Sequence, residues 1–301
     1  MKSVRVWQVD SFTQTPFSGN AAGVVLNAVG LTDIQMQNIA RELNNSETAF
    51  VLQPDADDHD VHVRFFTPTM EVPNCGHATL AAHFVRFTEL NIPEYAAVQK
   101  TGAGLQTIRV EQCNDHVRVF IDQGSPTFSD VLHIDITTRI LGALGLSQKD
   151  RDGRCPVMIA STGHSKVMIG IRERDVLNGL QPDMPLLGAL SQETGCNGYY
   201  VFVVEHNSST RCICHGRMFA PAIGIAEDPV TGNANGPLAA YLVHQGFDQV
   251  NSKLFHMSGH QGAAMGRPGE VQVKVRIERN IPVSVEISGN AIMIFQANIK
   301  P

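Results

Sequence analysis

Short apolar runs bounded by turn residues dominate the hydrophobic pattern of the chain. Such runs, joined by turns rather than by regular helices, are typical of strands in mixed or antiparallel sheets. They predict strands at Val4–Val9, Ala22–Leu26, Thr48–Leu52, Val61–Phe66, Gln106–Val110, Val117–Ile121, Val167–Ile171, Tyr199–Val204, Val271–Ile277, Val283–Ile287 and Ala291–Gln296.

One surface helix and two buried helices interrupt this strand pattern. Thr32 and Gln35 have the spacing of a capping box, and the apolar residues that follow recur at helical spacing, which predicts a surface helix after Thr32. Residues 78–87 and 238–243 are apolar on nearly every side. A helix with that pattern is buried on all sides, so we expect each to be wrapped by a sheet.

The two buried helices belong to a repeated segment. Residues 64–85 read RFFTPTMEVPNCGHATLAAHFV, and residues 217–243 read RMFAPAIGIAEDPVTGNANGPLAAYLV. Both run from a strand through proline and a turn to a glycine-led helix. Two copies of one unit predict duplicated domains rather than a solenoid, which needs at least about three repeats.

The predicted fold class is therefore α+β, with two pseudo-symmetric domains, each a mostly antiparallel sheet around a central helix. The turn at residues 122–126 marks the boundary. The domains are expected at residues 1–125 and 126–290, and a C-terminal strand at about 291–301 is expected to return to the first domain.

Composition and charge exclude several classes of function. The 301 residues are 43% hydrophobic and 17% charged, with a net charge of -6 and no cluster of Lys and Arg, which argues against a nucleic-acid partner. Apolar runs stay well short of the ~20 residues that span a bilayer. The N-terminus lacks the apolar stretch of a signal peptide, so a cytoplasmic location without membrane contact is expected.

Cofactor and metal motifs are absent from the sequence. The six cysteines are scattered, and Cys212-x-Cys214-His215 lacks a second ligand pair at zinc-site spacing, which favours alternate residues of a strand. A P-loop, a dinucleotide fingerprint, a nucleophile elbow and a Schiff-base lysine are not found. We expect no cofactor and no resident metal.

The two glycine-led helix starts, Gly76-His77 and Gly232-Asn233, are candidate anion sites. A helix N-terminus presents unpaired N–H groups and a positive dipole end, and glycine lets a ligand approach the backbone. If the domains face each other across a pseudo-dyad, both starts reach one cleft and suit a carboxylate. The alternative is that both glycines only form tight turns.

Three ionisable residues near these segments are candidates for chemistry. Glu47 begins an apolar strand, where partial burial would raise its pKa toward the range of a general acid/base; the alternative is an exposed strand-end glutamate. His77 either holds substrate and shares a proton or caps its own helix. Asp228 either binds a substrate amine or orients His77, or is a turn residue before proline.

Cys75 and Thr231 occupy equivalent places in the repeat. A two-base racemase needs an ionisable group on each side of the substrate carbon, and a threonine hydroxyl is a poor base. This asymmetry favours a one-base mechanism and indicates that Cys75 is a packing residue. An epimerase or dehydratase that depends on Cys75 is the competing enzymatic interpretation.

The chain resembles the PhzF family of phenazine-biosynthesis-like isomerases, which have the diaminopimelate-epimerase-like fold. The likeness covers nearly the whole chain and looks strongest to the YddE-type uncharacterised isomerases of enteric bacteria. It rests on five motifs: residues 17–25 (FSGNAAGVV), 46–50 (SETAF), 66–79 (FTPTMEVPNCGHAT), 161–165 (STGHS) and 219–234 (FAPAIGIAEDPVTGNA).

The resemblance implies a cofactor-free active site between two similar domains, and a homodimer. It implies that Glu47 is the acid/base, that His77 and Asp228 bind substrate or assist, and that Gly76 and Gly232 are the paired glycines. The family member of phenazine synthesis usually has Ser at the position of Asn233, so the phenazine substrate is in doubt.

Two functions therefore compete. The first is a cofactor-independent isomerase that shifts a proton on a small carboxylate-bearing substrate, held by Gly76, His77, Asp228, Gly232 and Asn233. The second is a non-catalytic small-acid-binding or scaffold homologue. Glu47, His77 and Asp228, each within its matching motif, favour the enzyme.

Overall fold

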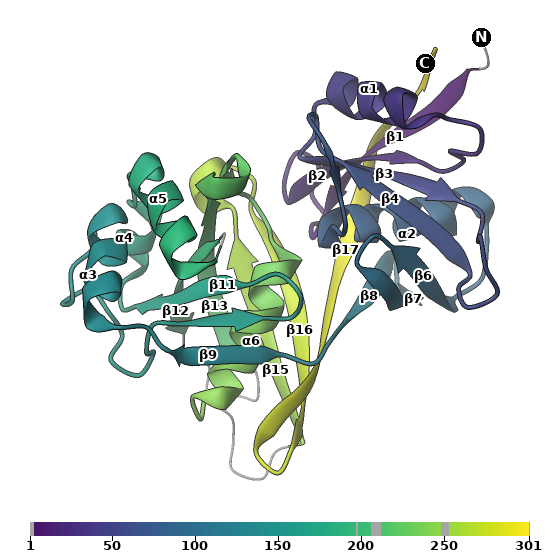
Figure 1. The fold of residues 1–301 in the computed structure, drawn as a ribbon. Helices are drawn as coiled ribbons and strands as arrows, with labels where there is room; N and C mark the ends of the chain where they lie inside the picture. The colour runs from purple at the N-terminus through teal and green to yellow at the C-terminus, as the bar shows by residue number, and fades with distance from the viewer. Residues whose placement is uncertain (1–2, 197, 206–211, 248–252, 301) are drawn as a thin grey trace. The chain divides into compact units, whose positions relative to one another are not determined.

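The computed structural model describes residues 3–196, 198–205, 212–247 and 253–300. The chain divides into two compact units (Figure 1): unit 1 comprises residues 1–122 and 288–301, and unit 2 comprises residues 123–287. Within the described ranges, none of the helices combines the length and apolar character needed to cross a membrane.

Unit 1 is built on strands that pair mostly antiparallel. β1 pairs antiparallel with β2 and with the C-terminal part of β17, and β2 pairs parallel with β3. β4 is antiparallel to β3 and β5 and parallel to β6, and β7 is antiparallel to β6 and β8. The bounds are β1 Val4–Ser11, β2 Asn20–Val25, β3 Glu47–Leu52, β4 Val61–Phe66, β5 Glu71–Val72, β6 Tyr95–Thr101, β7 Gly104–Cys113, β8 His116–Gly124 and β17 Ile281–Ile299.

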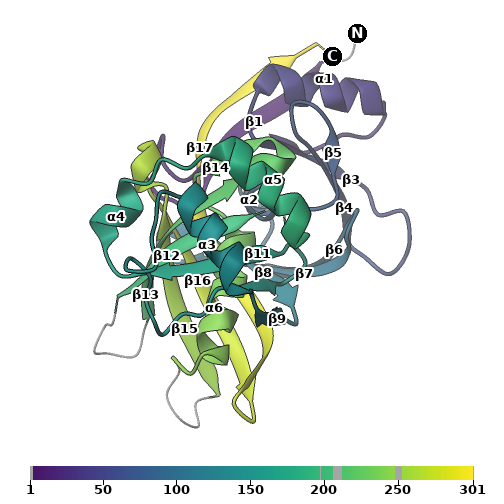
Figure 2. The ribbon, with the colours of Figure 1, turned by 60° about the vertical axis from the view of Figure 1, so that its left-hand side comes forward.

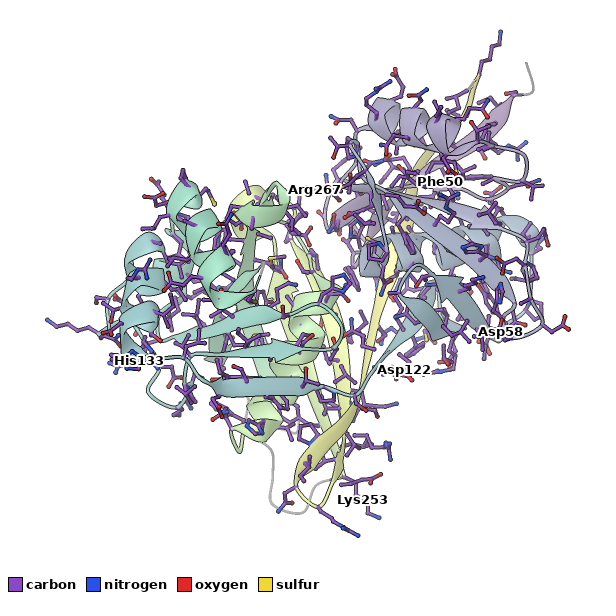
Figure 3. All side chains as sticks on the ribbon, viewed as in Figure 1. Phe50, Asp58, Asp122, His133, Lys253 and Arg267 are labelled. Atoms are coloured by element: carbon purple, nitrogen blue, oxygen red, sulfur yellow. The ribbon has the colours of Figure 1, made fainter. Side chains whose placement is uncertain are left out.

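Two helices cover the strands of unit 1. α1 (Asp33–Leu43) begins at the predicted capping box of Thr32 and Gln35, and its buried face packs in a cluster with Phe50 of β3 (Figure 3). α2 (Gly76–Leu90) is buried at residues 77–85 and packs against β1, β2, β3 and β7. The apolar pattern around this helix correctly predicted its burial.

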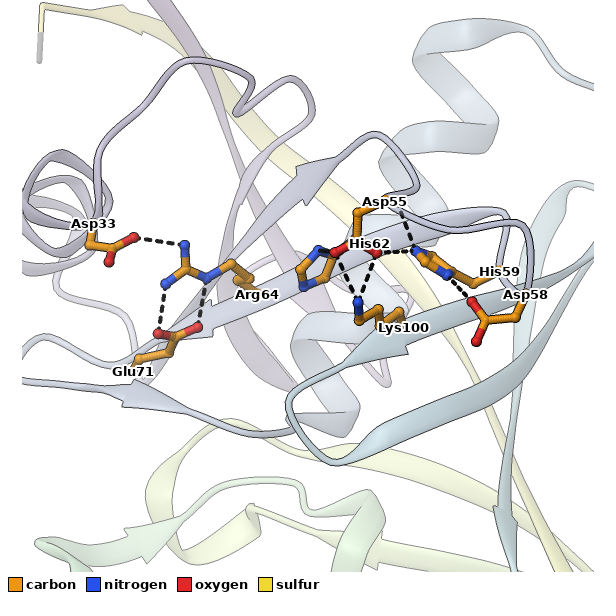
Figure 4. A network of polar contacts seen from close by, with 8 residues as sticks. All are labelled: Asp33, Asp55, Asp58, His59, His62, Arg64, Glu71 and Lys100. Carbon is orange, nitrogen blue, oxygen red and sulfur yellow. Dashed lines mark hydrogen bonds and ion pairs between the residues drawn. The ribbon is translucent and has the colours of Figure 1, made fainter.

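A line of charged side chains joins elements on the surface of unit 1 (Figure 4). Arg64 of β4 donates to both carboxylate oxygens of Glu71 on β5 at 2.7 Å and to Asp33 of α1 at 2.8 Å. Lys100 of β6 donates to Asp55 at 2.8 Å. Arg64 thus links α1, β4 and β5, and because these pairs are exposed, each adds little stability.

Unit 2 repeats the order of strand pairings of unit 1. β11 is parallel to β12, β12 is antiparallel to β13, and β13 is antiparallel to β14 and parallel to β15. β9–β10, β10–β11 and β15–β16 are antiparallel. The bounds are β9 Thr127–Val131, β10 Met158–Ser161, β11 Lys166–Ile171, β12 Tyr199–Glu205, β13 Cys212–Ala220, β14 Ile225–Asp228, β15 Leu254–Gln261 and β16 Gly269–Glu278.

In the described part of unit 2, three helices lie where the sequence predicted none. They are α3 (Ile134–Ala143), α4 (Arg174–Asn178) and α5 (Met184–Thr194), and α3 and α5 lie side by side (Figure 2). Their apolar residues form one core cluster with Val167, Ile169 and Ile171 of β11. The opposite face of β11 is also buried, and α6 (Gly232–His244) packs against this strand, so every residue of β11 is buried.

The predicted helix start at Gly232-Asn233 is confirmed. α6 begins at Gly232 and includes Pro237. Proline lacks the N–H that would bond to the carbonyl of Asn233, so α6 forgoes one bond of its ladder in its second turn.

The C-terminal strand is a further correction. Two strands were predicted at residues 283–287 and 291–296, but β17 runs unbroken from Ile281 to Ile299. Gly289 lies between the two predicted strands, and glycine is unfavourable inside strands. It is required there because a Cβ at this position would lie 2.4 Å from the ring of Phe12.

Short 3-10 turns complete the elements, at Pro221–Ile223 before β14 and at Ala263–Met265 before β16.

Candidate active site

Glu47 is the first residue of β3 and lies beside Ala22 of the parallel strand β2. Its side chain is only 12% exposed. Burial raises the pKa of the carboxyl group, and hydrogen bonds from Ser46 and Cys75 partly offset that rise. The alternative of an exposed strand-end glutamate is therefore wrong, and this carboxyl group is shifted toward the range of a proton shuttle.

The His77 ring connects this carboxyl group to its neighbours. His77 lies in the first turn of α2, and its Nε2 lies 3.3 Å from Oε2 of Glu47 and 3.2 Å from Oγ of Ser46. Its Nδ1 lies 3.2 Å from Nδ2 of Asn20. The ring thus contacts side chains from β2 and from the start of β3.

Cys75 belongs to the same cluster and does not pack only against apolar neighbours. It is the N-cap residue of α2, with Sγ 3.4 Å from Nδ1 of His77. Its thiol also hydrogen-bonds the Glu47 carboxylate. The interpretation of Cys75 as a packing residue missed this position, because sequence spacing does not reveal that β3 begins beside the start of α2.

The backbone around His77 is fixed by a neighbouring turn. Ser11 Oγ donates to the carbonyl oxygen of His77 at 2.8 Å. Gly19 adopts a φ of +62°, and a Cβ there would lie 2.1 Å from the carbonyl oxygen of Ser11. Glycine is therefore required directly before Asn20, the residue whose amide contacts His77.

Unit 2 holds the remaining predicted residues around the start of α6. Asp228 ends β14 and accepts a hydrogen bond of 2.5 Å from Oγ1 of Thr231, the N-cap residue of α6. Gln261 Nε2 donates to the Asp228 carbonyl oxygen at 2.7 Å and its Oε1 accepts from the Thr231 N–H at 3.1 Å. These bonds hold Asp228 at the helix start.

Asn233 is held by a separate hydrogen-bond chain within unit 2. Its Oδ1 accepts from Gln123 at 2.8 Å, and Gln123 Oε1 accepts from Thr162 at 3.0 Å. Gly236 leaves room for this chain, since a Cβ there would lie 1.9 Å from Gln123 Oε1.

The structure therefore brings Glu47, His77 and Gly76 together in unit 1, and Asp228, Gly232 and Asn233 together in unit 2. Neither helix start has a side-chain cap from its N-cap residue, Cys75 or Thr231. The sequence motifs did not point to a role for the supporting residues, although several flank or lie within them: Asn20, Ser46, Gln123, Thr231 and Gln261. That both helix starts serve one ligand stays a prediction.

Comparison with known proteins assigns the chain to a family. Residues 9–297 match the PhzC-PhzF family, described as phenazine biosynthesis-like protein. The chain belongs to this family. Its fold within the family resembles the crystal structure of a Bacillus anthracis PhzF-family protein, with a TM-score of 0.88, 28% identity and 100% of both chains covered.

Relatives in the PhzC-PhzF family are described as isomerases. The chain is 49% identical over 299 residues to an uncharacterised isomerase of Clostridium acetobutylicum, covering 99% of each chain. It is 46% identical to the uncharacterised isomerase YddE of Escherichia coli K12, covering 97% of each. A trans-2,3-dihydro-3-hydroxyanthranilate isomerase of Pseudomonas fluorescens is 30% identical, again covering 97% of each. These matches support an isomerase-like activity for the family.

Proposed function

We propose that the protein is a cofactor-independent isomerase in which Glu47 removes and returns a proton on a small carboxylate-bearing substrate. The observation that carries the proposal is the buried Glu47 carboxyl group, 12% exposed, with His77 Nε2 at 3.3 Å. A carboxyl group with a raised pKa exchanges protons with carbon more readily near neutral pH than an exposed one.

The reaction begins with Glu47 as the base. It takes a proton from a carbon that is alpha to, or conjugated with, the substrate carboxylate, and the electron pair shifts toward that carboxylate. The protonated Glu47 then delivers the proton to another position of the same conjugated system. His77, whose Nε2 lies 3.3 Å from Oε2 of the carboxyl group, positions Glu47.

Negative charge that develops on the substrate needs nearby donors. The N–H groups and dipole of the α2 start, at Gly76 and His77, are suited to stabilise it. We assign the equivalent start of α6, with Gly232, Asn233 and Asp228, to the same substrate on the strength of the sequence repeat. Small amino acids, hydroxy acids and unsaturated acids each carry a carboxylate that suits these donors.

Asn233 indicates that the substrate differs from the one for which the Pseudomonas fluorescens relative is named. The Pseudomonas fluorescens relative is named for trans-2,3-dihydro-3-hydroxyanthranilate. Where such enzymes usually have Ser, this chain has Asn233, whose oxygen is already bonded to Gln123. The amide nitrogen is then the group directed to a ligand, so we infer that the substrate presents an additional acceptor oxygen to Asn233.

Turnover of a panel of small carboxylates tests the proposal. Glu47→Gln should lower the rate by about 10²- to 10⁴-fold, the usual contribution of a general acid/base. The matched control is Glu42→Gln, which removes an exposed carboxylate from α1 and should leave the rate unchanged.

Two outcomes would favour the competing functions. If Cys75→Ser abolishes turnover while Glu47→Gln retains it, the chemistry depends on the thiol. If small acids raise the melting temperature of the wild type but no member of the panel is converted, the protein is a non-catalytic binder.

A further inference from the structure

Glu47, Cys75 and His77 together form a set of possible metal ligands. Each residue offers one donor atom: a carboxylate oxygen of Glu47, Sγ of Cys75 and a ring nitrogen of His77. These three atoms lie within 4.8 Å of one another. The side chains of Glu47 and His77 are 12% and 7% exposed, and Cys75 is 6% exposed. The sequence predicted no metal site because the donors come from separate elements, β3 and the start of α2.

The distances fit a tetrahedral ion. For zinc bonds of ordinary length, two ligands of a tetrahedron lie about 3.3 Å apart for nitrogen and oxygen and about 3.6 Å apart for sulfur and nitrogen. Nε2 of His77 lies 3.3 Å from Glu47 Oε2 and 3.9 Å from Cys75 Sγ. His77 is therefore within a few tenths of an ångström of these spacings from both partners, and the donor atoms of Glu47 and Cys75 lie within 4.8 Å of each other. The three side chains supply three corners and leave the fourth for water.

The chemistry of the donors selects the ion. A thiolate, an imidazole and a carboxylate are the three protein ligands that Zn²⁺ accepts, whereas Mg²⁺ and Ca²⁺ prefer oxygen alone. Thiolate and carboxylate together carry two negative charges, which the ion neutralises in a buried setting. When Cys75 ligates, its thiol proton passes to solvent.

A second layer of side chains is in place around the ring. The Asn20 amide lies 3.2 Å from Nδ1 of His77. With its oxygen turned to Nδ1–H, this amide is the type of partner that orients a ligating imidazole through its other nitrogen.

We propose that Glu47, Cys75 and His77 bind one Zn²⁺ and that the bound ion inhibits the enzyme by occupying the acid/base. Binding stands on the geometry alone. Inhibition rests on the proposed function of Glu47, because an ion-bound carboxylate cannot take a proton from the substrate.

Cobalt spectroscopy of the metal-free full-length protein tests the binding. One equivalent of Co²⁺ should give the visible bands of a tetrahedral site and a near-ultraviolet thiolate-to-cobalt band, and Zn²⁺ should displace both. Cys75→Ser should abolish the thiolate band, and Glu47→Gln should weaken Zn²⁺ binding by more than about 10-fold.

The chain offers a matched control in a second thiol pair. Cys212 and Cys214 lie on β13 with their sulfur atoms 3.8 Å apart. The Cys212→Ser, Cys214→Ser double variant should keep the full cobalt spectrum. A thiolate band that persists in Cys75→Ser, or the absence of the band in the wild type, would overturn the proposed site. Melting curves of the metal-free variants identify any that fail to fold, and for those Cys75→Ala replaces Cys75→Ser.

Turnover with and without one equivalent of Zn²⁺ tests the inhibition. We expect loss of activity in the wild type and in the Cys212→Ser, Cys214→Ser variant, with recovery after chelation. Full activity of the zinc-loaded enzyme would refute the inhibitory role. A wild type that binds Zn²⁺ with the expected spectrum but never turns over a substrate would instead count against the proposed function alone.

Discussion

At the scale of single residues, the site depends on neighbours that fix the state of Glu47. Burial raises the pKa of its carboxyl group, while Ser46 and Cys75 donate hydrogen bonds that lower it. The sequence correctly indicated partial burial, since Glu47 begins an apolar strand. It did not reveal Cys75 as a donor, because Cys75 is distant in the chain and reaches Glu47 only through the fold.

Gly19 provides a residue-scale prediction about the turn that positions Asn20. Gly19→Ala adds a Cβ that meets the Ser11 carbonyl oxygen at 2.1 Å, in addition to the strain of a φ of +62°. Gly30→Ala is the matched control, because Gly30 also has a positive φ, +87°, but no atom within 4 Å of the added Cβ. The control should cost about 1 kcal/mol of unfolding free energy, and Gly19→Ala should cost clearly more, as measured by urea denaturation. Equal costs would show that the close approach to Ser11 is unimportant.

His83 predicts how stability depends on pH. It is fully buried in α2, with Nδ1 2.8 Å from the Tyr95 hydroxyl and Nε2 2.9 Å from Gln99 Oε1, and burial lowers its pKa from 6.5 to about 3. Below pH 6.5 the unfolded chain protonates this ring while the folded chain does not, down to about pH 3. The unfolded state therefore binds more protons, and stability should fall as pH drops through this window.

The His83 contribution is measured as a difference between variants. Across that window the wild type should lose up to about 1.4 kcal/mol more per pH unit than His83→Gln. His116→Gln, which replaces an exposed histidine of β8, should behave like the wild type. If the pH dependence of His83→Gln matches that of the wild type, the ring does not stay neutral in the folded state.

At the scale of elements, local signals predicted some helices and missed others. The capping box of α1 and the all-round apolar pattern of α2 were sufficient. The missed helices α3 and α5 carried weaker signals. α5 follows the N-cap Asp183 and has a proline in its first turn, and α3 contains Ile136 and Ile140 at helical spacing. Short apolar stretches of this length are compatible with either a strand or a helix until packing decides.

The α1 cap gives the element-scale prediction. Thr32 Oγ1 accepts from the Gln35 N–H at 3.3 Å, and Gln35 Oε1 accepts from the Thr32 N–H at 3.0 Å. Thr32→Ala should lower the unfolding free energy by about 1 kcal/mol, whereas Thr32→Ser keeps the acceptor and should be nearly neutral. Urea denaturation of the three proteins would contradict this account if both variants were equally destabilised.

At the scale of the whole molecule, the sequence repeat corresponds to a shared order of strand pairings. In unit 1 the pairs β2–β3 and β4–β6 are parallel, and β3 is antiparallel to β4. In unit 2 the pairs β11–β12 and β13–β15 are parallel, and β12 is antiparallel to β13. The repeated motifs predicted this likeness because the same turn and glycine must begin both helices. They could not predict the continuity of β17, which depends on contacts far apart in the chain. The homodimer stays a prediction.

Solvent deuterium exchange tests the central assignment of Glu47 most directly. A converted substrate is incubated in D₂O with the wild type, Glu47→Gln or Glu42→Gln, and deuterium at the reacting carbon is followed by NMR. The account predicts incorporation by the wild type and by Glu42→Gln, and almost none by Glu47→Gln. Incorporation by Glu47→Gln at the wild-type rate would show that another group moves the proton.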